Sequence, residues 1–155
     1  MKRIINEMKL RLPARSANEG VARSAVSALV AELNPTVEEI GDIRLSVSEA
    51  VTNSIVHAYR DRPAGDPAYV YISARIYDNR EVSVEVSDNG CGIEDVELAR
   101  TPSYTTGEYG ERCGMGFLIM ENLCDVLTVK SRVGKGTTVL LRKFLSPGGE
   151  NDDGK

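Results

Sequence analysis

The stretch YVYISARIYDNREVSVEVS, residues 69–87, carries the strongest fold signal in this sequence. Apolar and polar side chains alternate through Tyr69–Tyr77 and again through Glu81–Ser87, which is the period of two expected of half-buried β-strands. Asp78-Asn79 lies between the two runs and favours a tight turn. The pattern therefore predicts an antiparallel hairpin with one buried face.

Three further strands are predicted on either side of this hairpin. Val126–Ser131 and Thr137–Phe144 flank Gly134-Lys135-Gly136, which predicts a second hairpin near the C-terminus. Alternation from Met8 to Leu12, stopped by Pro13, predicts a short first strand. Consecutive hairpins favour a sheet that is mostly antiparallel.

Three helices are predicted between these strands. Ser16–Glu19 and Thr36–Glu39 both match the capping box that begins a helix. The first helix is expected to end at Asn34-Pro35 and the second near Tyr59, because apolar residues recur at three- and four-residue spacing up to those points. The third covers Phe117–Leu123.

The resulting element order is β-α-α-β-β-loop-α-β-β. It predicts an α+β fold, a two-layer sandwich with a mixed, mostly antiparallel sheet and its helices on one face. We expect residues 1–145 to form a single domain and the acidic, Pro/Gly-rich residues 146–155 to be a disordered tail. Residues 93–113 are polar and lack a strong period, which indicates a mobile loop with one short helix.

Composition excludes several classes of function. Nineteen Lys and Arg against 23 Asp and Glu give a net charge of −4, so nucleic acid is not an expected partner. No run of 18 apolar residues and no leader pattern occurs, so neither a membrane partner nor secretion is predicted, and we expect a cytoplasmic protein. Cys91, Cys113 and Cys124 are widely spaced, which fits free thiols better than a zinc site.

Polar residues line one side of the second predicted helix. Glu49, Asn53 and His57 stand at i, i+4 and i+8 among small and apolar neighbours. A carboxylate and a carboxamide one turn apart can hold a general base and a metal ligand in fixed register. An ordinary solvated face is the competing interpretation, and His57 alone suits a structural role.

Three glycine-containing segments are candidates for ligand contacts. Asp88-Asn89-Gly90-Cys91-Gly92 follows a strand, where it forms either a turn or a site at which the backbone approaches a ligand closely. Gly114-Met115-Gly116 precedes the third helix, whose free N–H groups suit phosphate. Gly136-Thr137-Thr138 belongs to a hairpin turn that can face a ligand. P-loop and eukaryotic-type kinase motifs are absent.

Taken in order, these segments resemble the GHKL ATPase superfamily, which includes gyrase, Hsp90, histidine kinases and MutL. Glu49–Asn53 matches its N box, Asp88–Gly92 its DxGxG box, Gly114–Gly116 its GxG box and Gly136–Thr138 its threonine-bearing box. Over about residues 6–144 the chain is similar to the sporulation anti-sigma F factors, a family of serine-protein kinases. Its only histidine lies beside the N box, so histidine autophosphorylation has no candidate residue.

The resemblance implies ATP and Mg²⁺ as cofactors and a role for each matched residue. Glu49 would be the general base and Asn53 the Mg²⁺ ligand. Asp88 would accept a hydrogen bond from the adenine amino group, which discriminates against GTP about 10⁴-fold. The segment from Thr105 to Cys113 would close as a lid, from which Arg112 would touch the γ-phosphate. The full set of implied nucleotide-binding residues is Asn53, Asp88, Gly90, Gly92, Thr105, Thr106, Arg112, Gly114, Met115, Gly116 and Thr137.

The resemblance also implies partners. The family binds sigma F, phosphorylates an anti-anti-sigma factor on a serine and forms homodimers, and Glu19 and Arg23 match its partner contacts. Two alternatives stay open: an ATP-gated sigma-binding module without kinase turnover, and a regulator of another sigma factor, such as a general-stress one. Glu49 favours the kinase, because a gating site needs no base.

Overall fold

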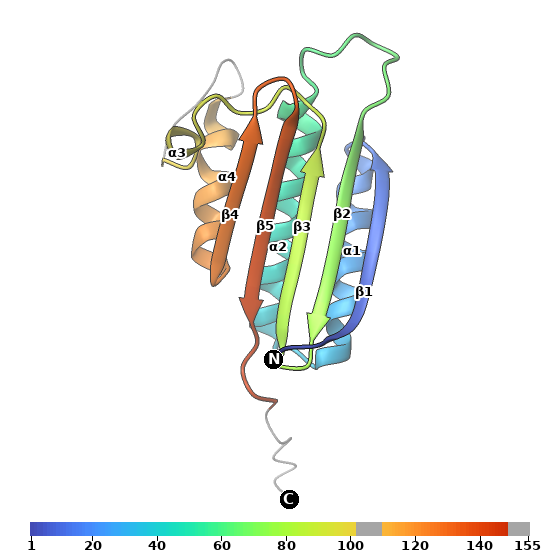
Figure 1. Ribbon diagram of the computed structural model, residues 1–155, viewed down its shortest axis with the longest axis vertical. Coiled ribbons are helices and arrows are strands. Elements are labelled where there is room, and N and C mark those ends of the chain that lie inside the picture. Colours follow the sequence, from blue (N-terminus) through green and yellow to red (C-terminus); the bar gives the residue numbers. More distant parts are fainter. Residues whose placement is uncertain (102–109, 149–155) are drawn as a thin grey trace, which may run out of the picture.

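Five strands form a single antiparallel sheet in the order β1-β2-β3-β5-β4 (Figure 1). The computed structural model describes residues 1–101 and 110–148, with only the backbone of residues 110–114. The strands are β1 (Ile4–Pro13), β2 (Tyr69–Tyr77), β3 (Glu81–Asp88), β4 (Val126–Arg132) and β5 (Gly136–Phe144). Both predicted hairpins, β2–β3 and β4–β5, are confirmed.

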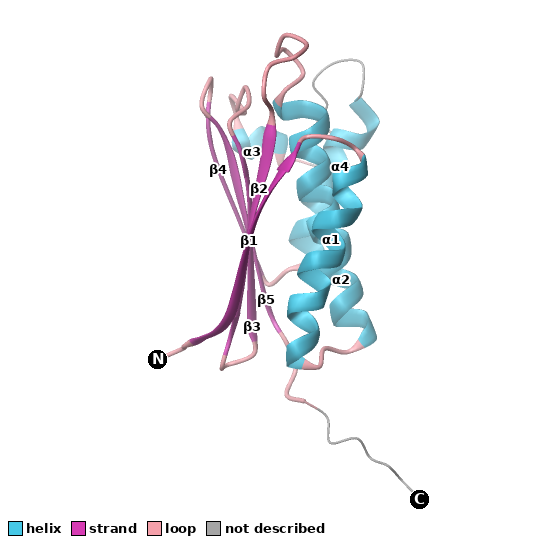
Figure 2. Cartoon of the chain, turned by 90° about the vertical axis from the view of Figure 1, so that its right-hand side faces the viewer, coloured by secondary structure: helices cyan, strands magenta, loops and turns pink. Residues whose placement is uncertain are grey.

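The helices cover one face of this sheet, and the other face is open (Figure 2). They are α1 (Ala17–Val30), the 3₁₀ turn η1 (Ala31–Leu33), α2 (Val37–Asn53), the π-helical turn η2 (Ser54–Ala58), α3 (Val96–Ala99) and α4 (Gly110–Leu123). The predicted α+β sandwich is therefore confirmed. No helix in the described part of the chain is long and apolar enough to cross a bilayer.

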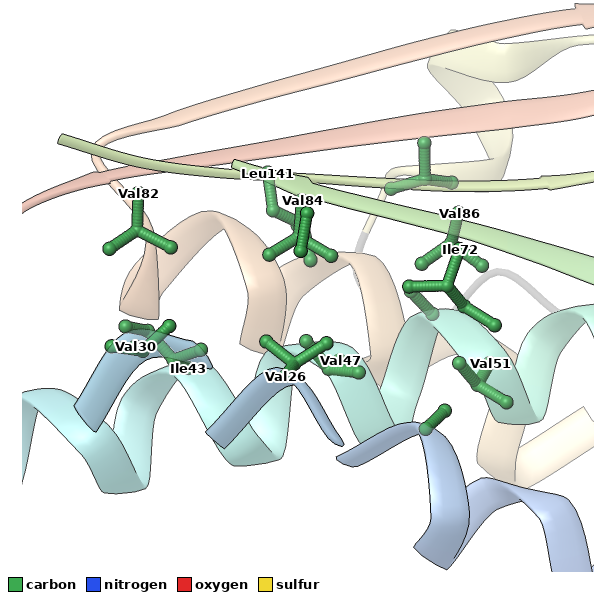
Figure 3. Packing of buried hydrophobic residues seen from close by; sticks show 14 of the residues in the cluster. Val26, Val30, Ile43, Val47, Val51, Ile72, Val82, Val84, Val86 and Leu141 are labelled. Carbon is green, nitrogen blue, oxygen red and sulfur yellow. The ribbon is translucent and has the colours of Figure 1, made fainter. Parts of the chain in front are cut away.

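The core lies between the sheet and the helices. Because strand side chains alternate between faces, Ile72 on β2, Val84 on β3 and Leu141 on β5 all point toward the helices. Val26 on α1 and Val47 on α2 pack against them from the helical layer (Figure 3). The alternation seen in the sequence is thus the alternation between core and open face.

One of the two predicted capping boxes is confirmed. At the start of α2, the Glu39 N–H donates to Thr36 Oγ1 at 3.1 Å and the Thr36 N–H donates to Glu39 Oε1 at 2.9 Å. The prediction at Ser16 is wrong, because its backbone is already helical and its side chain makes no cap bond. Glu19 instead accepts a hydrogen bond from Ser48 Oγ on α2.

Two predicted boundaries are also wrong. β1 begins at Ile4, earlier than expected, because it pairs with β2 from Ile4 to Pro13, with an irregularity in register between Ile4 and Asn6. α4 begins at Gly110 rather than at Phe117, so Gly114-Met115-Gly116 lies inside the helix and not ahead of it. The short helix predicted between residues 93 and 113 is confirmed as α3, although the first residues of α4 also lie in this range. Residues 102–109 lie outside the described residues, so the mobile loop stays a prediction.

The chain leaves the sheet beside the start of α2. The Ser146 N–H donates to Glu39 Oε2 at 2.7 Å, and Arg80 Nε donates to the Ser146 carbonyl at 2.7 Å. The first residue of the predicted tail is therefore bound to the domain. Residues 149–155 lie outside the described residues, and their disorder stays a prediction.

Replacing Ile72 by Ala tests the core. Ile72 is fully buried between the sheet and the helices, so the truncation is expected to lower the free energy of unfolding by about 2–5 kcal/mol. Val37→Ala is the control, because Val37 is 89% exposed and its loss is expected to change stability by at most about 0.5 kcal/mol. Urea unfolding measures both, and equal effects would contradict the assigned core.

Candidate functional site

Four predicted segments meet at one end of the molecule, at the top of Figure 1. α2 ends there, β3 ends there, β5 begins there, and α4 packs against α2. A Cβ atom added to Gly116 would lie 3.2 Å from Glu49 Oε2 and 3.2 Å from Asn53 Nδ2. Gly116 therefore lies directly against the predicted base and the predicted metal ligand, and a side chain at this position would require both groups to shift by a few tenths of an ångström.

Asp88 is the buried charge of the site. It is the last residue of β3 and is only 7% exposed. Its Oδ2 accepts a hydrogen bond from Ser54 Oγ at 3.0 Å, and its Oδ1 accepts from the Gly90 N–H at 3.0 Å and the Thr137 N–H at 3.2 Å. One carboxylate thus ties η2, the turn after β3 and the start of β5.

Burial raises the pKa of Asp88 above its ordinary value, although the three hydrogen bonds act in the opposite direction. Donors from the described residues occupy three of the roughly four lone-pair positions of this carboxylate. The remaining one, on Oδ2, can accept from a donor that enters the site. An N–H or O–H group is the type of donor that this position can accept.

The turn after β3 depends on its glycines. A Cβ atom at Gly90 would lie 2.1 Å from the Ala58 carbonyl oxygen, and one at Gly92 would lie 2.3 Å from the Arg132 carbonyl oxygen. Gly92 also has a φ of +74°, which other residues rarely adopt. The DxGxG segment can approach η2 and the β4–β5 hairpin only because these two side chains are absent.

The π turn at the end of α2 is a feature that sequence reasoning missed. It covers Ser54–Ala58 and includes His57, so the helix changes from α to π geometry directly after Asn53. That Glu49, Asn53 and His57 form one polar line stays a prediction. Burial lowers the pKa of His57, in keeping with a neutral structural histidine. The same turn brings the Ser54 hydroxyl to Asp88, and its only sequence signal was its position next to Asn53.

Thr137 contributes to the site through its backbone and its hydroxyl. Its N–H reaches Asp88, and its Oγ1 lies 2.8 Å from Ser131 Oγ on β4. Ser131 Oγ also accepts from the Ile93 N–H at 2.7 Å and donates to the Gly136 carbonyl at 3.1 Å. Ser131, which was not predicted, joins the DxGxG turn to the hairpin.

The remaining nucleotide-binding predictions lie on or next to α4. Thr105 and Thr106 lie outside the described residues, so the lid stays a prediction. Arg112 and Gly114 belong to the backbone of α4, and the side chain of Arg112 lies outside the described residues. Met115 is described and exposed. Because α4 begins at Gly110, its unbonded N–H groups belong to its first turn and not to the GxG segment.

The two predicted partner residues lie together on α1. Arg23 Nη1 is 3.5 Å from Glu19 Oε1, and Ser48 holds the same carboxylate from α2. Arg23 Nε is buried and has no hydrogen-bond partner among the described residues. The pair forms a polar patch where α1 meets α2.

A separate hollow of about 800 Å³ lies on the open face of the sheet. Its described lining includes Lys9, Arg11, Tyr71 and Glu81, and it contains none of the predicted site residues. The candidate site is therefore the end of the sandwich around Asp88, not this hollow.

Comparison with known proteins assigns the family. The model of the histidine kinase-like ATPase domain matches residues 12–143. The anti-sigma F factor of Heyndrickxia coagulans is 48% identical over 141 residues, covering 91% of this chain and 94% of that protein. The anti-sigma F factor of Geobacillus kaustophilus strain HTA426 is 50% identical over the same length and shares. This chain belongs to the anti-sigma F factor family. Its domain is thus of the ATP-binding, histidine kinase-like type.

Solved structures with this fold occur in larger proteins. The RsbU and RsbW domains of Rv1364c from Mycobacterium tuberculosis match with a TM-score of 0.63 and 21% identity, over 93% of this chain and 34% of that one. The histidine kinase domain of a blue-light activated kinase from Erythrobacter litoralis EL346 matches with a TM-score of 0.54 and 25% identity, over 86% and 62%. The similarity to the Mycobacterium tuberculosis structure supports the fold alone. The similarity to the Erythrobacter litoralis domain agrees with the histidine kinase-like ATPase domain that the family model matches.

Asp88→Asn tests the cost of the buried carboxylate. The folded state holds the Asp88 proton more tightly than the unfolded chain does, so this group adds stability as the pH falls through its raised pKa. Asn has the same shape and cannot titrate. We therefore expect the stability of the wild type relative to the variant to increase as the pH is lowered from neutral toward 3.8, the ordinary pKa of this group, measured by urea unfolding at each pH. A difference in stability between wild type and variant that does not change with pH would contradict the raised pKa of Asp88.

Proposed function

We propose that this chain is a Mg²⁺-ATP-dependent protein serine kinase that binds and inhibits the sporulation sigma factor F and phosphorylates the anti-anti-sigma factor. The observation that carries the proposal is the position of Glu49 and Asn53 against Gly116, at the same end of the sandwich as the buried Asp88. Near-full-length similarity to proteins named anti-sigma F factor supports the sigma factor as partner. A homodimer is part of the same proposal.

Asp88 would select adenine. Its one unused acceptor position, on Oδ2 beside Ser54, suits the amino group of adenine. Guanine carries a carbonyl oxygen at the equivalent position, which would face a carboxylate without a proton between them. That unmatched pair is expected to reject GTP about 10⁴-fold.

Glu49 and Asn53 would act on the phosphates. Mg²⁺, when bound, neutralises charge on the phosphates and takes few protein ligands, so one amide oxygen from Asn53 fits its preference. Glu49 accepts the proton of the serine hydroxyl as that oxygen bonds to the γ-phosphorus and ADP leaves. Gly116 keeps space open beside both side chains.

The competing proposal is a nucleotide-gated binding module. Such a module needs Asn53, Asp88 and the glycines, but it gains nothing from a carboxylate at Glu49. The position of Glu49 Oε2 beside Asn53 and Gly116 therefore favours the kinase. A different sigma factor would change the partner and leave this chemistry intact.

Glu49→Ala tests the kinase. Intact mass of the anti-anti-sigma factor, after incubation with Mg-ATP and this protein, is expected to increase by one phosphate with the wild type. With Glu49→Ala the rate is expected to fall by about 10²–10⁴-fold, because the general base is lost. Glu38→Ala is the matched control, since Glu38 lies exposed in the first turn of α2. Replacing ATP by GTP should also prevent transfer.

Full transfer by Glu49→Ala would disprove the base assignment. No transfer by the wild type, with ATP binding still measurable, would instead favour the gated module. The two outcomes separate the chemistry from nucleotide binding.

Arg23→Glu tests the partner surface. Reversing this charge places a second carboxylate beside Glu19, so we expect weaker binding of the sigma factor. The Kd for ATP is expected to be unchanged, because Arg23 pairs with Glu19, which is not one of the residues proposed to bind the nucleotide. Lys130→Glu on β4 makes the same change of charge elsewhere and should leave both affinities unchanged. Pull-down measures binding of the sigma factor, and isothermal titration measures the Kd for ATP. Loss of both affinities in Arg23→Glu would contradict a specific role in partner binding.

A further inference from the structure

A loop joins η2 to β2, and two of its side chains reach back to the DxGxG turn. Tyr59 directly follows η2 and is partly buried. Its hydroxyl donates to the Tyr69 carbonyl at 2.6 Å and accepts from the Asn89 N–H at 2.9 Å. This single hydroxyl therefore joins the first residue of β2 to the residue after Asp88.

Arg62 completes the contact from the same loop. Its Cζ lies 4.6 Å from the centroid of the Tyr59 ring, a cation–π arrangement. Its Nη2 donates to the Asn89 carbonyl at 3.0 Å, and its Nη1 donates to the Pro67 carbonyl. Between them, Tyr59 and Arg62 bond both backbone polar groups of Asn89.

Asn89 lies between Asp88 and Gly90, which are hydrogen-bonded to each other. Asp88 precedes it, and the Gly90 N–H that follows it donates to Asp88 Oδ1. Because hydrogen bonds weaken steeply as their angle departs from linear, the direction of the unused Oδ2 position depends on how this turn is held. The backbone of Asn89 is the part of the turn that Tyr59 and Arg62 control.

We infer that Tyr59 and Arg62 are positioning residues for the nucleotide site, acting through the backbone of Asn89 on the orientation of Asp88. The inference rests on the proposed function, because it presumes that Asp88 binds adenine. Burial raises the pKa of Tyr59, so its hydroxyl keeps the proton that it donates to Tyr69. Both hydrogen bonds of this hydroxyl are therefore retained at neutral pH.

The first test uses Tyr59→Phe with Tyr71→Phe as its matched control. Tyr59→Phe removes the acceptor for Asn89, whereas Tyr71→Phe removes a hydroxyl from the open face of the sheet. Isothermal titration with Mg-ADP is expected to give about a 10-fold higher Kd for Tyr59→Phe, the equivalent of one buried hydrogen bond, and an unchanged Kd for the control.

Two further measurements and a second variant separate positioning from general destabilisation. Amide hydrogen exchange followed by NMR should become faster at Asn89 and Gly90 in Tyr59→Phe without nucleotide, while the core strands stay protected. In phosphotransfer, KM for ATP should increase by about the same 10-fold while kcat at saturating ATP is unchanged. Arg62→Ala should behave like Tyr59→Phe, with Arg60→Ala as its control, because Arg60 comes from the same loop and pairs with Asp61.

The double variant gives the decisive comparison. If both residues act through Asn89, combining Tyr59→Phe with Arg62→Ala should weaken ADP binding by less than the product of the single effects. Wild-type affinity in Tyr59→Phe, despite faster exchange at Asn89, would overturn the positioning role and leave the proposed function intact. Failure of the wild type itself to bind ADP or ATP would overturn the proposed function and, with it, this inference.

Discussion

The arrangement of this end of the molecule depends on one buried carboxylate. Asp88 accepts hydrogen bonds from η2, from its own turn and from β5, three segments far apart in the sequence. Burying a charge is costly unless its hydrogen bonds are satisfied, so these segments are held where their donors reach it. In the function that we propose, the same carboxylate uses a remaining acceptor position for the ligand, so it would supply the recognition group in addition to organising the site.

Close backbone contacts around Asp88 explain why glycines surround it. A Cβ atom at Gly136 would lie 2.0 Å from the Asp88 carbonyl oxygen, and Gly90 meets Ala58 at a similar distance. These contacts bring three backbone segments together with little side-chain volume between them. The glycines thus belong to the geometry of the turn, in addition to any contact that they make with a nucleotide.

α2 connects the core to the site. Its apolar face packs under the sheet through Val47 and Val51, while Glu49 and Asn53 face α4 at Gly116. The confirmed capping box at Thr36 begins the helix, and η2 ends it one wide turn beyond Asn53. Because the core holds α2 firmly, the base and the metal ligand that we propose stand on a rigid element.

The sequence alone determined the elements whose signals are local. Alternation in residues 69–87 predicted β2 and β3, spacing predicted α1 and α2, and four short boxes predicted which residues gather at the site. The tertiary structure decided what depends on distant partners. Ser48 engages Glu19 where a capping box was expected, the π turn brings Ser54 to Asp88, and Tyr59 reaches Asn89. Periodicity is set by neighbours along the chain, whereas these bonds are chosen by groups brought near only when the sheet and helices pack, so no local pattern contains them.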